Sequence, residues 1–535
     1  MTRHSRRATM IAATVFSIVG LVGGCTTVTP ENTDTTDTAA TDPAAASAPP
    51  NVVAGVPIPD GRVDEAVGKL DGIVDELMAS SGIPGMAVAV VHGGKTVYAK
   101  GFGVRDVGSG DSVDADTVFQ LASVSKSLAA TVVAHQVGTK SIDWTTPIVS
   151  KLPWFALRDP LVTQTVTIGD LFAHRSGLPE HAGDNLEDLG YDRRQILERL
   201  RLEPLDPFRI SYNYTNFGLT AAAEAVATAA NTDWAQLSDQ VLYQPLGMSS
   251  TSSRFADFKA RPNHAVGHVK VDNEWVAEYV REPDEQSPAG GVSSSVNDMS
   301  KWLTMMLANG RFDDKEIAPA DAILPAISVQ SVSSPSTSPD ARAGFYGYGF
   351  NVGTSPAGRT VYSHSGAFAL GAGTNFLVIP SADVAIVALT NAAPIGLPET
   401  LTAEFSDLVQ FGEVRENWRD LYRDAFSALD DPAGSLVGQT APTNPALPPP
   451  LQSLAGRYDN EYWGPATIAE TNGNLVLTMG PKNVTYPLTH WDGDTFTFPL
   501  SGENAAPGSI SKSTFSGNSL TLEYFDEDGL GRFNR

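Results

Sequence analysis

The spacing of apolar residues separates helical from extended segments along the chain. In DEAVGKLDGIVDELMAS, residues 64–80, apolar positions recur at the period of an amphipathic helix. GMAVAVVHGGKTVYAKGFG, residues 85–103, predicts two strands joined by a turn at Gly93-Gly94. The pattern is then mostly helical as far as about residue 310, and TVTIGD within it is typical of a capped helix start.

Strand signals return after this helical region, in GYGFNVG, RTVYSHSG and TNFLVIPSADVAIVALTN. One long helix is expected to follow them, from about Pro398 to Ala428. Because strands lie at both ends of residues 56–428, we predict an antiparallel sheet assembled from both ends, flanked by helices and carrying a helical insertion.

Two segments of biased composition mark candidate linkers. Residues 26–55 are rich in Thr, Ala, Asp and Pro, and we expect a disordered tether there. Residues 429–450 form a second, Pro-rich linker. Beyond it, residues 451–535 alternate between short strands and turns, which predicts a small β-barrel or sandwich.

Composition narrows the class of protein. The 535 residues are 42% hydrophobic, which is enough for sizeable cores and too much for general disorder. The formal net charge of −25 disfavours nucleic acid as a partner. No grouping of His, Cys and Asp has the spacing of metal ligands, and no phosphate-binding loop is present, so neither a metal nor a cofactor is expected.

The single cysteine, Cys25, has a distinctive position. A basic head with Arg3, Arg6 and Arg7 precedes a short apolar run, and the sequence VGG leads into Cys25. This pattern resembles a bacterial lipoprotein signal, so residues 1–25 predict export and a lipid anchor facing the extracytoplasmic side of the membrane. A short membrane anchor with a chance cysteine is the alternative, but the apolar run is short for a span. Whether export follows the Sec or the twin-arginine route stays open.

Two S-x-x-K pairs are candidates for a nucleophile and its base. Ser123 and Lys126 open SVSKSLAATVVAHQV, which predicts a helix, and residues three apart share one helix face. Ser509 and Lys512 lie among short strands and turns, where residues three apart point to opposite faces. A serine at a helix N-terminus also lies in a positive field that favours an oxyanion. We therefore favour Ser123.

Two further short motifs contain polar side chains that could assist a catalytic serine, although each motif occurs more than once. A Y-x-N sequence starts at Tyr214, and another starts at Tyr458. An H-x-G sequence starts at His364, at the end of a predicted strand, and others start at His92 and His181. Each motif is weak by itself, so their order along the chain must decide between the copies.

S-x-x-K at Ser123, Y-x-N at Tyr214 and H-x-G at His364 follow the order found in the serine β-lactamase and penicillin-binding-protein superfamily. TIGDLFAHRSGLP, SPAGGVSSSVNDMSKWL and YGYGF are also similar, so residues 56–428 resemble the class C and esterase-like branch. Residues 451–535 resemble the lipocalin-like barrel appended to some members. The implied fold is α+β, with a β-lactamase-like antiparallel sheet, flanking helices and a C-terminal β-barrel.

The resemblance implies a role for each motif residue. Ser123 would be the nucleophile that forms an acyl-enzyme, and Lys126 would take or relay its proton. Tyr214 would act as a general base or acid, and which of Lys126 and Tyr214 is the first base stays open. Asn216 would hold the substrate amide or Lys126. His174, in LFAHRSG, is expected to be structural.

The strand that carries H-x-G is implied to bind the substrate. The backbone N–H groups of Ser123 and Ala367 would form the oxyanion hole, and Ser365 would contact the substrate. Gly366 would let the strand pass close to it. His364 is the fourth residue implied to be catalytic. It stands where β-lactamases usually carry lysine, so its charge would vary with pH, which argues against strong β-lactam hydrolysis.

The sequence therefore predicts an envelope-anchored serine hydrolase that cleaves an amide or ester through an acyl-enzyme. The expected substrate is a D-amino-acid peptide or a small ester, and the envelope location makes a peptidoglycan-derived peptide a candidate. A β-lactamase or DD-carboxypeptidase is the alternative within the same chemistry. A non-catalytic ligand-binding lipoprotein is the alternative of another class, although binding alone requires none of Ser123, Lys126 and Tyr214. The oligomeric state is not predicted.

Overall fold

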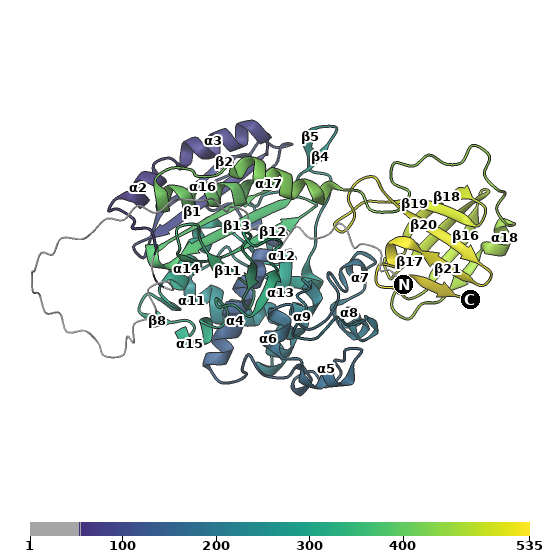
Figure 1. Ribbon diagram of the computed structural model, residues 1–535, viewed down its shortest axis with the longest axis horizontal. Coiled ribbons are helices and arrows are strands. Elements are labelled where there is room, and N and C mark those ends of the chain that lie inside the picture. Colours follow the sequence, from purple (N-terminus) through teal and green to yellow (C-terminus); the bar gives the residue numbers. More distant parts are fainter. Residues whose placement is uncertain (1–52, 54) are drawn as a thin grey trace, which may run out of the picture.

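The computed structural model describes residue 53 and residues 55–535. They form a large body and a barrel at the C-terminal end of the chain (Figure 1). The predicted signal segment, Cys25 and nearly all of the predicted tether lie outside the described residues. In the part of the chain that is described, no helix has both the length and the apolar character needed to span a membrane.

The large body is built on one eight-stranded sheet whose neighbouring strands are all antiparallel. β1 (Gly85–His92) pairs with β14 (Val384–Thr390), so strands from the two ends of the body lie side by side. This confirms the predicted assembly of the sheet. The remaining strands are β2 (Lys95–Gly103) beside β1, and then, beyond β14, β13 (Ala372–Ile379), β12 (Thr360–Phe368), β11 (Asn351–Thr354), β10 (Gly344–Tyr346) and β9 (Ser331–Ser334).

Alternate residues of β1 contribute to two hydrophobic layers, one on each face of the sheet. Met86 and Val88 belong to one layer, whereas Ala87 and Ala89 belong to the other. The helices of the first layer are α2 (Arg62–Val67), α3 (Leu70–Ser81) and α16 (Leu397–Phe411), and those of the second include α4 (Ser125–Gly138), α9 (Asn216–Ala229) and α14 (Val296–Leu307) (Figure 1).

The single long helix expected from about Pro398 to Ala428 is wrong, because two helices occupy this segment. α16 ends where Gly412 adopts φ +84, and the N–H of Gly412 bonds to the carbonyl oxygen of Leu408. This left-handed conformation is the usual glycine stop signal of a helix. The chain then turns before α17 (Trp418–Ser427) begins.

The C-terminal domain is a nearly closed barrel of eight antiparallel strands that pair in chain order. Asp459 and Asn534 exchange two backbone hydrogen bonds, of 2.7 and 3.0 Å, and so join the two ends of the sheet. Closure removes exposed strand edges. The strands are β15 (Gly456–Tyr458), β16 (Ala466–Thr471), β17 (Asn474–Met479), β18 (Val484–Asp492), β19 (Thr495–Leu500), β20 (Ser509–Ser516), β21 (Ser519–Leu522) and β22 (Arg532–Asn534).

The barrel contacts the body at α7 (Asp184–Asp188), which lies on the side of the body that faces the barrel (Figure 1). Tyr524 Oη donates a hydrogen bond of 3.0 Å to Asn185 Oδ1. Asn504 Nδ2 donates one of 2.8 Å to the carboxylate of Asp188. Barrel residues therefore bond to this short helix near both of its ends.

The residue beside Asn504 reaches a different part of the body. The carboxylate of Glu503 accepts the backbone N–H groups of Ala369 and Leu370 at 3.1 and 3.3 Å, in the turn that follows β12. Arg281 lies between Glu503 and Glu187 and forms an ion pair with each. One barrel loop therefore touches both α7 and the end of β12.

Candidate active site

Ser123 lies in a tight turn rather than within a helix. A 3-10 turn over Ala122–Val124 leads into α4, so the helix predicted around S-x-x-K begins just after the nucleophile. Ala122 has φ +46, which is uncommon for a residue with a side chain, and it packs against Phe368. The turn leaves Ser123 partly exposed, whereas Lys126 is fully buried.

The side-chain nitrogen of Lys126 has three polar neighbours. It lies 3.0 Å from Ser123 Oγ, 2.7 Å from Asn216 Oδ1 and 3.0 Å from the carbonyl oxygen of Ala289. Burial lowers the pKa of Lys126 to about 7, although the negative charge of Asp184 partly opposes this shift. Near neutral pH a large share of Lys126 is therefore uncharged and able to accept a proton.

Tyr214 packs beside the Ser123–Lys126 pair. Its ring centroid is 4.5 Å from Lys126 Nζ, and its phenol is hydrogen-bonded to Ser123. Burial raises the pKa of Tyr214, and the hydrogen bond to Ser123 offsets only part of the rise. The phenol therefore stays protonated at neutral pH and is a proton donor.

Asn216 connects Lys126 to a carboxylate that the sequence did not single out. Asn216 Nδ2 donates a 2.8 Å hydrogen bond to Asp184 Oδ2, so the opposite end of the amide, Oδ1, faces Lys126. Asp184 is buried at the start of α7 and also contacts His181 Nδ1 at 2.9 Å. Nothing in HAGDNLEDLG distinguishes Asp184 from its acidic neighbours, because only the fold brings it to Asn216.

His364 is buried in β12 and hydrogen-bonded at both ring nitrogens. Nε2 lies 2.7 Å from Tyr346 Oη, and Nδ1 lies 2.6 Å from the carbonyl oxygen of Ser365. A carbonyl oxygen only accepts, which assigns the proton to Nδ1 and makes Nε2 the acceptor of the Tyr346 hydroxyl. Burial, followed by nearby Lys126, lowers the pKa of His364 to about 3. The imidazole is therefore neutral at physiological pH, and the pH-dependent charge expected from the sequence does not arise.

The end of β12 extends past its neighbour β11 and lies beside the Ser123 turn. β11 pairs with β12 only over residues 360–363, so the strand continues from His364 to Phe368 beyond that pairing. A Cβ on Gly366 would lie 2.2 Å from the carbonyl oxygen of Leu121 and 3.1 Å from the nitrogen of Ser123. Only glycine allows this close approach. Ala367 comes next and is half-buried, and its part in an oxyanion hole stays a prediction.

The side chain of Ser365 points away from this site, unlike the substrate contact predicted for it. Asn375 Nδ2 donates a 2.8 Å hydrogen bond to Ser365 Oγ, and Ser365 is also hydrogen-bonded to Glu399 in the first turn of α16. Successive strand residues face opposite sides of a sheet, and Gly366 faces Ser123. Ser365 reaches the site only through its carbonyl oxygen, which fixes the His364 ring.

His174, expected to be structural, lies directly against Tyr214. The two ring centroids are 4.5 Å apart. The N–H of Thr215 donates to His174 Nδ1 at 3.1 Å, and the N–H of Asn213 donates to the carbonyl oxygen of His174 at 2.9 Å. His174 therefore holds the residues on both sides of Tyr214.

The second S-x-x-K pair has a different environment. Ser509 and Lys512 both lie on β20, where residues three apart face opposite sides. Ser509 Oγ donates to the carbonyl oxygen of Ala506 at 2.7 Å, and Lys512 pairs with Glu523 at 3.5 Å. The two side chains are thus bonded to other groups.

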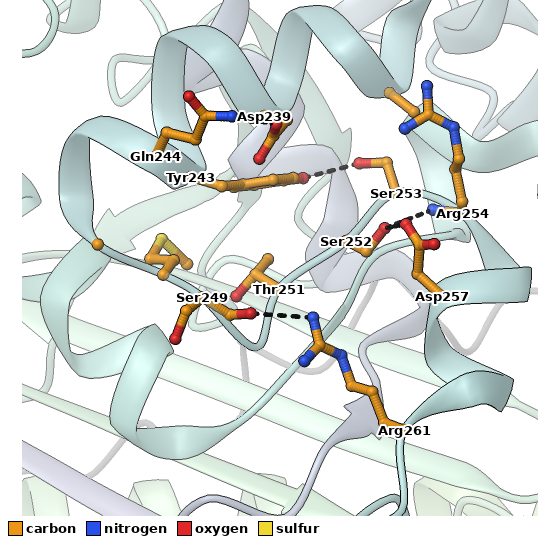
Figure 2. A pocket seen from close by; sticks show the side chains of 13 residues that line it. Asp239, Tyr243, Gln244, Ser249, Thr251, Ser252, Ser253, Arg254, Asp257 and Arg261 are labelled. Carbon is orange, nitrogen blue, oxygen red and sulfur yellow. Dashed lines mark hydrogen bonds between the residues drawn. The ribbon is translucent and has the colours of Figure 1, made fainter.

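A surface pocket within residues 235–261 lies apart from these residues (Figure 2). Its polar groups bond to one another, as Tyr243 Oη does to Ser253 Oγ at 2.8 Å and Arg261 does to the carbonyl oxygen of Ser249 at 3.0 Å. Ser252 Oγ donates to the carboxylate of Asp257 at 2.6 Å, but no Lys or His lies in this lining. Across the described residues, no group of three His, Cys, Asp or Glu side chains is placed to hold a metal ion.

Two family models and several known proteins match this chain. The family model described as Beta-lactamase matches residues 70–409, and the model described as "Domain of unknown function (DUF3471)" matches residues 439–528. The chain is 28% identical to "Unguisins hydrolase ungD'" of Aspergillus campestris, over 76% of this chain and 78% of that protein. It is 26% identical to "Esterase EstB" of Burkholderia gladioli, over 64% of this chain and 94% of that protein.

A solved structure shares the fold. The octameric penicillin-binding protein homologue from Pyrococcus abyssi has a TM-score of 0.58 and 19% identity, over 88% of this chain and 100% of that chain. The Beta-lactamase model matches more than half of the chain, and the relatives are hydrolases by name. The chain therefore belongs to the β-lactamase family and is a serine hydrolase.

Proposed function

We propose that this protein is an envelope-anchored hydrolase that cleaves an amide or ester bond through an acyl-enzyme on Ser123. The observation that carries the proposal is the 3.0 Å contact between Ser123 Oγ and Nζ of the buried Lys126. A serine hydroxyl needs a base to become nucleophilic near neutral pH, and a lysine with a pKa of about 7 supplies one.

The hydrogen bonds of Lys126 favour it over Tyr214 as the first base. A neutral amine has two N–H donors and one lone pair. Asn216 Oδ1 and the carbonyl oxygen of Ala289 only accept, so they use both N–H groups. The lone pair is left for the hydroxyl proton of Ser123, while the raised pKa of Tyr214 makes its phenolate scarce.

The proposed reaction balances its protons. Ser123 Oγ attacks the carbonyl carbon as its proton moves to Lys126, and the backbone N–H groups of Ser123 and Ala367 stabilise the oxyanion. When the C–O or C–N bond breaks, Tyr214 donates a proton to the leaving group and regains one from Lys126. Water then attacks the ester on Ser123 and passes a proton to Lys126. As the C–O bond to Ser123 Oγ breaks, Lys126 returns this proton to Oγ and the acid product leaves.

The neutral state of His364 supports one class of substrate over another. A permanent cation at this position would attract a substrate carboxylate, and His364 provides none at physiological pH. This argues against β-lactams and against DD-carboxypeptidase substrates, which carry that carboxylate. The extended end of β12 suits a peptide that pairs with it as a strand. We therefore favour a D-amino-acid peptide or a small ester, and the similarity to an enzyme named as an esterase supports the ester.

Nitrocefin turnover tests the alternative within the same chemistry. We expect slow turnover or none, because the neutral His364 offers no positive charge to the carboxylate of the drug. A nitrocefin rate above the rates for D-peptides and esters would instead identify a β-lactamase.

The envelope location rests on the lipoprotein-like signal that ends at Cys25. Lipidation there would bring this protein to the cell wall, where peptidoglycan-derived peptides are available as substrates. Cys25→Ala in the full chain should release the protein from the membrane fraction of the cell. Membrane association that persists in Cys25→Ala would contradict the lipid anchor.

Active-site labelling tests the hydrolase itself. The chain that begins after Cys25 is treated with a fluorophosphonate, and its intact mass and modified peptide are measured beside Ser123→Ala and the matched control Ser509→Ala. We expect one adduct, on the peptide that contains Ser123, which only Ser123→Ala abolishes. Folded protein without this adduct would refute the proposal and favour the ligand-binding lipoprotein.

A further inference from the structure

We propose that Asp184 is a positioning residue of the hydrolytic site, and that it acts through Asn216 on the amine of Lys126. The inference rests on the proposed function, because it concerns the proton acceptor of Ser123. It assigns a task to a carboxylate that belongs to none of the three sequence motifs.

Asp184 is a buried carboxylate with two nitrogen partners. Its Oδ2 accepts from Asn216 Nδ2 at 2.8 Å, and His181 Nδ1 lies 2.9 Å from the same atom. The Asp184 side chain is only 5% exposed. A carboxylate withdrawn from water in this way is stable only when such partners hold it, so its geometry is fixed. Through these bonds Asp184 joins α7 to the start of α9.

The carboxylate decides which way the Asn216 amide points. An ionised carboxylate only accepts hydrogen bonds, so it selects the NH2 end of the amide. The carbonyl end, Oδ1, is then directed at Lys126 Nζ, 2.7 Å away. In the opposite orientation the NH2 group would point at Nζ and compete with the Ser123 hydroxyl for the lone pair. Asp184 therefore keeps that lone pair available to Ser123.

The charge of Asp184 also acts on Lys126. A nearby anion favours the protonated amine, and Asp184 opposes the effect of burial on the pKa of Lys126. The other titratable side chains that face Lys126 are Tyr214, His174, His181 and His364. Burial lowers the pKa of both His174 and His364, so they add no positive charge at neutral pH. Removal of the Asp184 charge would lower the pKa of Lys126 further.

α7 is too short to hold Asp184 in place by itself. It has 5 residues, and a single helical turn is marginal in water. Barrel residues bond to both sides of this turn, Tyr524 to Asn185 and Asn504 to Asp188. The contact with the barrel therefore supports the segment that orients Asn216.

The test compares Asp184→Asn with Asp192→Asn, which makes the same chemical change at the exposed N-cap of the next helix, α8 (Arg193–Arg199), where asparagine caps equally well. The second-order rate of fluorophosphonate labelling at Ser123 is measured at about pH 9, where Lys126 is neutral in every variant. We expect Asp184→Asn to slow labelling about 10-fold or more and Asp192→Asn to change it less than about 3-fold. Equal rates for Asp184→Asn and the wild type would overturn the inference.

A double-mutant cycle distinguishes positioning from a general loss of structure. In an Asn216→Ala background, Asp184→Asn should change the labelling rate less than about 3-fold, because the amide that it orients is gone. Losses that multiply independently would overturn the inference.

The pH profile is a second readout. The acidic limb of the labelling rate should move to lower pH in Asp184→Asn, and a limb that does not move would contradict the action of the Asp184 charge on Lys126. Absence of labelling in the wild type would instead refute the proposed function.

Discussion

Labelling of Ser123 should rise with pH along one titration centred near 7, because burial lowers the pKa of Lys126 to about 7 from the ordinary value of 10.5. At pH 7 a lysine with the ordinary pKa is neutral in roughly 1 of 3,000 molecules, whereas about half of Lys126 is neutral. The gain in available base is therefore about 10³-fold. The shift corresponds to roughly 5 kcal/mol of preference for the uncharged amine.

The labelling rate should increase with pH because Lys126 acts as a base. Protonated Lys126 has no lone pair, so the rate should fall about tenfold for each pH unit below the midpoint and level off above it. The assay is the rate of fluorophosphonate labelling between about pH 5 and pH 9, read by intact mass. Lys126→Arg is the matched control, because a guanidinium keeps its proton at every pH in this range and should abolish labelling throughout.

Titration of His181, rather than of Lys126, could also produce a change of labelling rate near pH 7. Burial would lower the pKa of His181, but its hydrogen bond to Asp184 raises the pKa overall. His181→Gln keeps a donor for Asp184 and should keep the acidic limb near 7. A limb that disappears in His181→Gln, or a wild-type limb near pH 10, would refute Lys126 as the base.

Three further changes examine the neighbours of this pair. Tyr214→Phe should slow hydrolysis of an alkyl ester by about 10²–10⁴-fold. It should slow hydrolysis of a p-nitrophenyl ester far less, because nitrophenolate leaves without a proton. Equal losses for the two esters would contradict the role of Tyr214 as the acid. His174→Ala should lower kcat about tenfold at unchanged KM, because the Thr215 N–H loses its acceptor, and His174→Asn should restore part of the loss. If KM alone changes, His174 does not position Tyr214. Glu503→Ala should lower kcat for a p-nitrophenyl ester, because the Ala369 N–H beyond β12 loses its acceptor, and unchanged kinetics would show that this turn needs no barrel contact.

The nucleophile and its lysine could be predicted because their relation is local. Ser123 and Lys126 are close in sequence, and helical spacing brings such residues to one face. The same rule excluded Ser509, because the flanking pattern predicted a strand, and β20 is a strand. The order of the motifs added Tyr214, which no local rule connects to Ser123.

Ser365 shows where strand periodicity allowed a better prediction. If His364 and Gly366 face the site, the residue between them must face the other side of the sheet. The same reasoning applied to β12 would have assigned the Ser365 side chain to the layer beneath α16, where the structure places it.

Asp184 and the neutral state of His364 could not be predicted, because both depend on tertiary contacts. Asp184 meets Asn216 only when α7 packs against the start of α9. The pKa of His364 is lowered by burial and by Lys126, and neither cause is visible in a strand of alternating residues. A position that reads as a pH-sensitive cation in the sequence is an uncharged, hydrogen-bonded ring in the folded protein.

The barrel contacts the two segments near the active site that have the least support from the body itself, α7 and the turn after β12. The nucleophile turn is secured by α4 and by the sheet, but α7 is a single turn and the segment after β12 ends in N–H groups that need an acceptor. One barrel loop stabilises both segments, since Asn504 bonds to α7 and Glu503 bonds to the turn after β12. α7 carries Asp184, and the turn after β12 follows Ala367 in the chain. Loss of this loop contact should therefore reduce activity more than it reduces the stability of the sheet, because it frees the residues that orient the base and the oxyanion strand while leaving the hydrophobic layers intact.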